Sequence, residues 1–341
     1  MLRPGNGVLR IGAVVAVGLF LVLLPQARTD LLNYEFAFVG IYFIAIIGLN
    51  VVSGYSGQIS IGHGAFLCFG AYTTAILSSS HTVAVGKYWT IPIAGALTGI
   101  FGLLFGLPAL RLTGVYLALA TFGLATSITL VAKRFEGLTG GGGGKHVSLL
   151  SSPIGGVTTN EWNSYLVWGV AGVMFAGAWL LLRGSFGRAL RAVRDAPIAA
   201  ASSGLNLAKY KTLAFGISAA YAGVAGALLA ISTGYVNPDT FPVSLSILLL
   251  TGAVIGGLGS LEGMLFGAFF VQFGPKYAED LSKHVHYNEA TVQSTVLYGL
   301  LLLGVLFVMP TGAAGLLRRT GWILKLSRGW LYSRRDSRAA A

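Results

Sequence analysis

Long apolar runs separated by short polar segments dominate this chain. A helix needs about 20 apolar residues to cross a hydrocarbon core of about 30 Å. Runs near that length lie at 8–25, 36–53, 89–110, 112–132, 163–182, 211–231 and 291–310, and a slightly shorter one lies at 61–79. The long run 243–273 is interrupted by GGLGSLEG, which predicts two short crossings or a broken helix pair. We therefore expect an all-α polytopic membrane protein with about ten transmembrane helices, some of them short or broken by glycine. Eight full crossings with a re-entrant pair are the alternative.

Composition supports this fold class. The mean hydropathy is +0.75, and only 10% of the residues are charged, whereas about 25% is usual for a soluble domain. The chain has 49 glycines, and small residues let transmembrane helices approach closely. The single cysteine, Cys68, excludes an intrachain disulfide and a cysteine-based metal site, and we expect it to be a small apolar filler.

The formal net charge is +12, and the placement of the basic residues along the chain predicts an orientation in the membrane. Nucleic-acid binding is excluded because the basic residues are scattered over short connecting segments and a tail, with no soluble domain to present them. Cytoplasmic segments carry an excess of Lys and Arg. The segments 183–211 and 311–341 hold six and seven of these residues, and both are cytoplasmic if the N-terminus is inside. We expect one transmembrane domain, 1–310, with a cytoplasmic loop at 184–210, and a basic cytoplasmic tail, 311–341.

The first apolar run could be mistaken for a secretory signal, because Arg3 and Arg10 precede or open it. The residues before Arg28 are Pro25, Gln26 and Ala27, and proline is a poor residue for a cleavage site that needs small side chains. We expect an uncleaved helix, with both chain termini in the cytoplasm.

The loop segment GRALRAVRDAPIAAASSGLN, 187–206, contains three arginines at a spacing of three. Burying three arginines in a bilayer would cost on the order of 9 kcal/mol, so they lie outside the hydrocarbon core. Asp195 can cap a helix that has Pro197 in its first turn, and Gly204 can end it. This predicts a short helix, Ala196 to Ser203, whose small faces suit docking into a groove of another protein. The alternative is a basic loop that only enforces topology. The residues expected to couple the chain to a partner are Gly187, Arg188, Arg191, Arg194, Asp195, Pro197, Ala199, Ala200 and Gly204.

Two glycine-rich interruptions, SGYSGQISIGHGAF at 53–66 and TGAVIGGLGSLEGMLFGAF at 251–269, break apolar spans. Irregular backbone at membrane depth needs protein or a water-filled cavity around it, and broken spans in both halves of a chain indicate a transport pathway. Close helix packing through glycine is the alternative, and His63 could serve only to bond backbone. The predicted pathway residues are Gly54, Gly57, Gln58, Ser60, His63, Gly64, Gly256, Gly257, Gly259 and Ser260.

No catalytic or nucleotide-binding motif is present. The run GLTGGGGGKH, 137–146, departs from the phosphate-binding pattern G-x-x-x-x-G-K-[ST] at Thr139 and His146, and we interpret it as a flexible external loop. HExxH is absent, and His284 and His286 lack partners at metal-ligand spacing, so no metal site is expected. Most spans contain no ionisable group, which argues against an intramembrane enzyme. Any ATP that drives transport must be hydrolysed on another chain.

Four blocks of the sequence resemble the LivM-type permease subunits of branched-chain amino acid ABC importers. They are GLNVVSGYSGQISIGHGAFLCFGAYTTAIL (48–77), RLTGVYLALATFG with LTGG (111–123, 138–141), GRALRAVRDAPIAAASSGLNLAKYKTLAFGISAAYAGVAGALLA (187–230) and SILLLTGAVIGGLGSLEGMLFGA (246–268). The resemblance covers roughly 36 to 310, with the blocks in the expected order. It departs after LTGG, where this chain continues in glycine.

The resemblance implies a permease of the bacterial inner membrane. Its partners would be a homologous LivH-like permease, two ATPase subunits that bind ATP and Mg, an extracytoplasmic amino-acid-binding protein and membrane lipid. It also implies that 187–206 docks on an ATPase, and that transport is by alternating access with no cofactor on this chain. Relatives carry urea or other small polar solutes, which leaves these as alternative substrates. An ATP-independent secondary transporter or channel is the rival from a different class.

Overall fold

The computed structural model describes residues 30–79, 87–109, 112, 114–147, 158–284, 286–287, 290–291, 294–309 and 312–315. The expected first helix, 8–25, lies outside the described residues, and so does the basic tail from residue 316 onward. Residues 148–157, which follow the glycine run, are also outside them.

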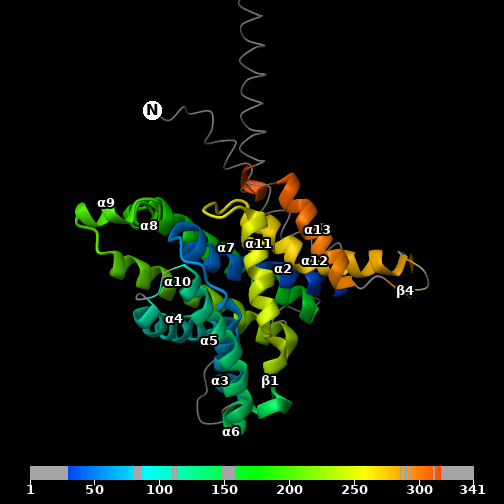
Figure 1. Ribbon diagram of the computed structural model, residues 1–341. Helices are drawn as coiled ribbons and strands as arrows, with labels where there is room; N and C mark the ends of the chain where they lie inside the picture. The colour runs from blue at the N-terminus through cyan, green and yellow to red at the C-terminus, as the bar shows by residue number, and fades with distance from the viewer. Residues whose placement is uncertain are drawn as a thin grey trace, which may run out of the picture.

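The described chain is largely helical, which confirms the predicted class (Figure 1). Six helical stretches are long and apolar enough to cross a membrane, namely Asp30–Tyr55, Thr90–Pro108, Val115–Arg134, Thr159–Arg183, Leu207–Thr233 and Pro238–Gly256. They contain α2 (Asp30–Leu49) with the π-helical η2 (Asn50–Tyr55), α4 (Thr90–Ala109), α5 (Val115–Arg134), α7 (Thr159–Arg183), α10 (Leu207–Thr233), and η5 (Pro238–Thr240) with α11 (Val243–Gly256). Three further helices are α3 (His63–Ser79), α12 (Met264–His284) and α13 (Ser294–Val308). The predicted break in 243–273 is confirmed, because α11 ends at Gly256 and α12 begins at Met264.

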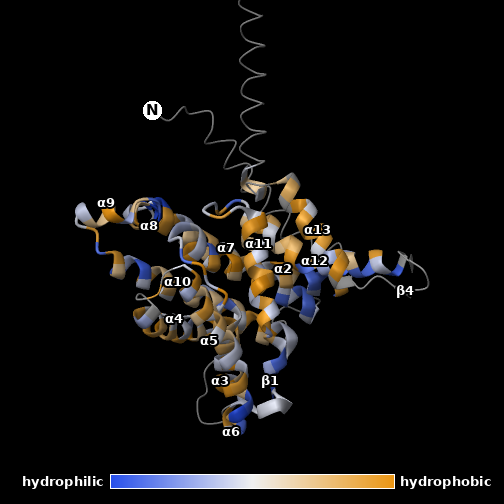
Figure 2. Ribbon diagram, viewed as in Figure 1, coloured by the Kyte–Doolittle hydropathy of each residue, from blue (hydrophilic) through white to orange (hydrophobic). Residues whose placement is uncertain are grey.

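The remaining elements are short. They are η3 (Lys87–Trp89), α6 (Glu136–Thr139), η4 (Gly141–Gly143), β1 (Lys145–His146), α8 (Ser185–Asp195), α9 (Pro197–Ser202), β2 (Tyr235–Val236), β3 (His286–Tyr287) and β4 (Ala290–Thr291). Figure 1 places α8 and α9 at one end of the molecule and α6 and β1 at the opposite end. Figure 2 shows hydrophilic residues gathered on α8, around α6 and at the far end of α12, whereas α11 and α13 are mostly hydrophobic. This distribution is typical of a membrane protein with polar segments at both ends of its apolar helices.

Helix α10 forms the centre of the fold and packs against α4, α3 and α2. In its spanning stretch 89% of the residues are buried, against 22% for α7. Glycine makes the closest approach possible, since a Cβ on Gly70 of α3 would lie only 2.5 Å from the Cα of Gly223 of α10. In lipid there is no hydrophobic driving force between helices, so their association depends on van der Waals packing, which small residues at the crossing make possible.

Helices α11 and α12 form an antiparallel hairpin through two facing G-x-x-x-G pairs, Gly252 with Gly256 and Gly263 with Gly267. A Cβ on Gly256 would lie 2.8 Å from the carbonyl oxygen of Gly263, and a Cβ on Gly267 would lie 2.8 Å from the carbonyl carbon of Gly252. These four glycines therefore allow the two helices to pack closely.

The glycine run 137–146 is an ordered cap, not the flexible loop that its composition predicts. Gly140 and Gly144 have φ angles of 78° and 67°, which glycine adopts without strain. These turns allow β1 to pair with β2, with Lys145 opposite Val236 and His146 opposite Tyr235. The Tyr235 hydroxyl also donates a hydrogen bond to the carbonyl oxygen of Gly143. The sequence prediction is wrong because the pairing strand lies about 90 residues away in the chain.

Candidate functional site

Helix α8 carries the three arginines and is strongly amphipathic. It buries Gly187, Ala189, Leu190 and Val193 and leaves Arg188 and Arg191 exposed. A Cβ on Gly187 would lie 2.5 Å from the carbonyl carbon of Leu182, so only glycine lets α8 fold back onto the end of α7. The arginines therefore lie on the outer surface of a helix held firmly against the bundle.

Helix α9 follows α8. Of the three residues predicted to begin or end it, Pro197 and Gly204 have the predicted roles. Pro197 occupies the first turn. Gly204 has a φ of 84°, its N–H bonds to the Ala201 carbonyl at 3.0 Å, and the N–H of Leu205 bonds to the Ala200 carbonyl at 3.1 Å. This is the paired hydrogen bonding of a Schellman motif.

The predicted capping role of Asp195 is wrong. Asp195 is the last residue of α8, and the N-cap of α9 is Ala196, which has φ −147° and ψ 72° and makes no side-chain capping bond. The Asp195 carboxylate instead accepts a hydrogen bond from Nε of Arg194 at 2.7 Å. The hydrogen bond and charge of Arg194 hold the pKa of this carboxyl below its ordinary value.

The exposed surface of α9 contains a large apolar side chain that the sequence reasoning missed. Ile198 is 83% exposed, whereas Ala200, one of the predicted contacts, is only 4% exposed and faces the protein. Ala199 is exposed beside Ile198. Ile198 is the only large apolar residue in the short helix, and that composition was the signal that could have identified it.

We call η2 (Asn50–Tyr55) together with the non-helical residues 56–62 that follow it the first break. Gly57 has a φ of 72°, and the buried Gln58 donates from Nε2 to Ser56 Oγ at 2.6 Å and to the Lys211 carbonyl at 3.2 Å. Ser60 is also buried, at 1% exposure. Two backbone amides of the break also find partners inside the protein, because the N–H of Gln58 donates to the Val52 carbonyl and the N–H of Ile61 donates to Thr121 Oγ1, both at 3.0 Å.

His63 and Gly64 begin α3 after this break. His63 is buried, and its Nε2 lies 2.8 Å from the carbonyl oxygen of Ala45, which is the backbone-bonding role left open by the sequence. The N–H of Gly64 donates to Ser246 Oγ at 2.9 Å. Both residues therefore connect α3 to neighbouring helices, α2 and α11.

The second break lies between α11 and α12. Gly257 and Gly259 have φ angles of 100° and 81°, conformations that favour glycine. The hydroxyl of Ser260 donates to the Gly257 carbonyl at 3.0 Å. The break is therefore a tight, internally bonded turn.

Asn50 joins the two breaks. Its Nδ2 donates to the Ser260 carbonyl at 2.7 Å, and its Oδ1 accepts from the N–H of Gly259 at 2.8 Å. The side chain is fully buried, and it belongs to the π-helical turn η2; such turns occur often at functional sites. Gly54 allows the contact, since its Cβ would lie 2.5 Å from the Gly259 nitrogen. Sequence reasoning missed Asn50 because it lies inside an apolar run.

Arg194 reaches from α8 to the same place. Its Nη1 donates to the Gly54 carbonyl at 2.5 Å. A Cβ on Gly57 would lie 2.6 Å from Arg194 Cγ, and one on Gly259 would lie 3.2 Å from Nη1. The structure thus brings the predicted coupling segment and both predicted pathway segments together at one point.

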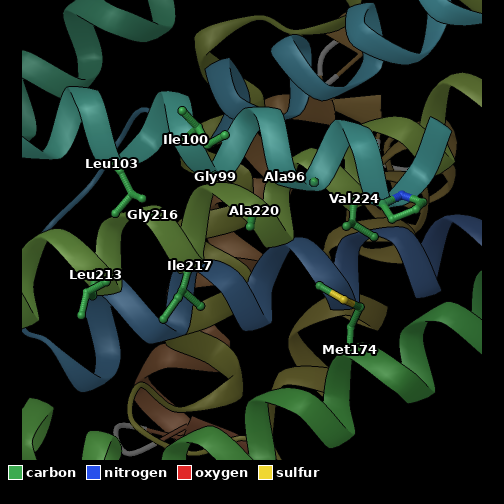
Figure 3. Close-up of a pocket in the computed structure, with 12 residues that line it drawn as sticks. Ala96, Gly99, Ile100, Leu103, Met174, Leu213, Gly216, Ile217, Ala220 and Val224 are labelled. Atoms are coloured by element: carbon green, nitrogen blue, oxygen red, sulfur yellow. The ribbon is translucent and has the colours of Figure 1, made fainter. Parts of the chain in front are cut away.

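An apolar surface groove lies elsewhere on the molecule. It runs between α4, α7 and α10, and Figure 3 shows Gly99, Leu103, Met174, Ala220 and Val224 along it. A neighbouring groove shares Met174 and Val224. None of the predicted pathway residues lines either groove. Within the described ranges, no group of three or more His, Cys, Asp or Glu residues could hold a metal ion.

Comparison with known proteins identifies the family. Residues 32–309 match the family model described as branched-chain amino acid transport system / permease component. This chain belongs to that permease family. The permease is 34% identical over 317 residues to the LivM permease protein of the high-affinity branched-chain amino acid transport system of Escherichia coli K12, covering 85% of this chain and 70% of the relative.

Other relatives of the permease are more distant. It is 28% identical to the LivH permease protein of Salmonella typhimurium over 80% of this chain and 91% of the relative. It is 30% identical to the autoinducer 2 import permease LsrC of Klebsiella pneumoniae over 76% of this chain and 75% of the relative. No solved structure matches the permease.

Proposed function

We propose that this chain is the membrane-spanning permease subunit of an ATP-driven importer for branched-chain amino acids or related small polar solutes. The observation that carries the proposal is the family match over 32–309 together with the LivM relative. The capped helix α9, which presents Ile198 outward at one end of the molecule, adds a surface suited to a separate motor protein.

We further propose ten crossings, made by 8–25 with α2, α3, α4, α5, α7, α10, α11, α12 and α13. Thr158 at the start of α7 donates to Asp30 at the start of α2, so these helices begin at the same side. Gly312, after α13, lies against Gly257, near the break that contacts α8. With one crossing before α2, both termini fall on the side of α8 and α9. The basic residues there favour the cytoplasm.

The importer would be completed by other subunits in the bacterial inner membrane and on its two sides. They are a LivH-like permease partner, two ATPase subunits that bind ATP and Mg, and an extracytoplasmic binding protein. This chain would bind no nucleotide, and residues 1–310 would form one permease domain followed by the tail 311–341. The similarity to both LivM and LivH supports a pair of related permeases.

Transport would proceed by alternating access. The binding protein delivers a zwitterionic solute, ATP closes the paired ATPases, and α8 and α9 move with them. The broken segments around Gln58 and Ser260 would line part of the pathway, with half-helix N-termini favouring a substrate carboxylate. Selectivity can reside in the binding protein, because the permease has no need to hold solute tightly.

A secondary transporter would need buried ionisable groups for ion coupling. Glu35 of α2, whose side chain is 12% exposed, forms an ion pair with Lys276 of α12 and also accepts a hydrogen bond from Gln272. This carboxylate is a poor site for a coupling ion, because Lys276 and Gln272 already occupy its two oxygens.

The test is uptake of labelled leucine by proteoliposomes that contain both permeases and both ATPases, with the binding protein added outside. We expect uptake only with ATP inside, and competition by isoleucine and valine. Uptake without ATP would refute the importer. The LsrC relative makes a different solute the second candidate. This candidate would be favoured if urea or autoinducer 2, but not leucine, is carried.

A further inference from the structure

Among the described residues, Arg194 is the arginine or lysine whose side chain contacts both broken segments. It donates to the Gly54 carbonyl in the first break, and its alkyl chain lies on Gly57. The end of the same guanidinium lies beside Gly259 in the second break. The residue is therefore bound to backbone that is 140 positions away in the sequence.

Charge and shape hold this side chain in place. A hydrogen bond from a charged donor is roughly twice as strong as one between neutral groups. The Asp195 carboxylate accepts from Nε at 2.7 Å and orients the planar group, while Nη1 is left for Gly54. A lysine cannot make two divergent bonds from one rigid fork.

The position of Arg194 joins two parts of the molecule that the chain separates. It is the penultimate residue of α8, one turn before the docking helix α9, and the chain between them bends at Ala196. On the other side, Asn50 ties the first break to Gly259 and Ser260. A displacement of α9 that reaches Arg194 would therefore act on both breaks together.

We propose that Arg194 is the positioning residue that transmits movement of the ATPase-docked segment to the two broken segments of the pathway. This inference rests on the proposed function. All three arginines of α8 are exposed, and Arg191 lies with its guanidinium 6.0 Å from the ring of Tyr55; the hydrogen bond to Gly54 is what distinguishes Arg194. Within the described residues, the side chains of Arg188 and Arg191 make no hydrogen bond to either break.

The experiment compares Arg194→Gln with Lys209→Gln in the reconstituted complex of both permeases, both ATPases and the binding protein. Lys209 is exposed on the neighbouring α10, and its loss removes the same charge without touching the breaks. Three quantities are measured: co-purification of the ATPases, leucine carried per ATP hydrolysed, and nucleotide-dependent hydrogen exchange of residues 54–62 and 257–263.

We expect Arg194→Gln to retain its ATPases and to hydrolyse ATP, but to carry about tenfold less leucine per ATP. Nucleotide should still change hydrogen exchange in α9 but no longer in the two breaks. Lys209→Gln should resemble the wild type in all three quantities. A role in stability alone would not remove the nucleotide response of the breaks while leaving that of α9.

Wild-type leucine transport per ATP in Arg194→Gln, or an unchanged nucleotide response of its breaks, would overturn the inference. If the Arg194→Gln complex does not assemble, the same measurements are made on Arg194→Lys. If the Arg194→Lys complex does not assemble either, Arg194 is needed for folding, and the inference is overturned. Failure of the proposed function is distinguishable, because the wild-type complex itself would then show no ATP-dependent leucine uptake.

Discussion

Replacing Gly70 with alanine should weaken the crossing of α3 with α10. The added Cβ would lie 2.5 Å from the Cα of Gly223, with the carbonyl oxygen of Gly223 nearer still. Ordinary contact begins at 3.4 Å, so the helices must separate by about 1 Å. Overpacking of this kind costs typically about 1–3 kcal/mol, more than alanine gains over glycine in a helix, which is at most about 1 kcal/mol.

The chain contains its own reporter for this measurement. Cys68 is the only cysteine, lies in α3 and is 1% exposed. A maleimide dye that fluoresces on reaction with thiol should therefore report unfolding as the purified protein is heated in detergent. At about 2–4 °C for each kcal/mol, we expect the midpoint for Gly70→Ala to fall by several degrees.

Gly172→Ala is the matched control. Gly172 lies in α7, is exposed, and has no atom within 4 Å of the position of an added Cβ. Its midpoint should be unchanged or slightly raised, because alanine is the better helix former. Equal midpoints for Gly70→Ala, Gly172→Ala and the wild type would show that the crossing is not as tight as described.

Three further substitutions test other features. Ile198→Glu should abolish co-purification of the ATPases while changing the thermal midpoint little, since the side chain is 83% exposed; retained binding would refute the docking surface. Asn50→Leu should lower the midpoint in the thiol assay, because the Gly259 amide loses its acceptor at a cost of about 1–3 kcal/mol; an unchanged midpoint would contradict this. Lys133→Met should cost under about 1 kcal/mol, because its ion pair with Asp239 is 42% and 68% exposed, and a larger loss in urea unfolding would show that the pair is more than a surface contact.

Local chemistry explains what was predictable from the sequence. Pro197 and Gly204 are tied to one backbone position each, so they placed α9 within a residue at each end. The glycines of both breaks likewise marked where the spans are interrupted. Asp195 misled, because the same side chain can cap a following helix or bond to its neighbour Arg194, and only the folded backbone decides between them.

The connections between segments could not be predicted. Asn50 bonds to residues about 210 positions away, and Arg194 to a carbonyl 140 positions away. No local pattern encodes such a pair, because each partner is a backbone atom that any residue could supply. For this reason the sequence separated coupling and pathway residues that the fold places at one point.

The enclosure of α10 has a consequence for variation in this chain. A helix with 89% of its spanning stretch buried by protein has little room for a larger side chain, except where Ile217 and Ala220 line the apolar groove. Alanine, glycine and serine should therefore be irreplaceable along much of α10 in a saturation mutagenesis screen. Helix α7, with only 22% of its spanning stretch buried, should accept most apolar exchanges. The pattern of tolerated and rejected substitutions would then show which helix faces are buried in the protein, without any labelling experiment.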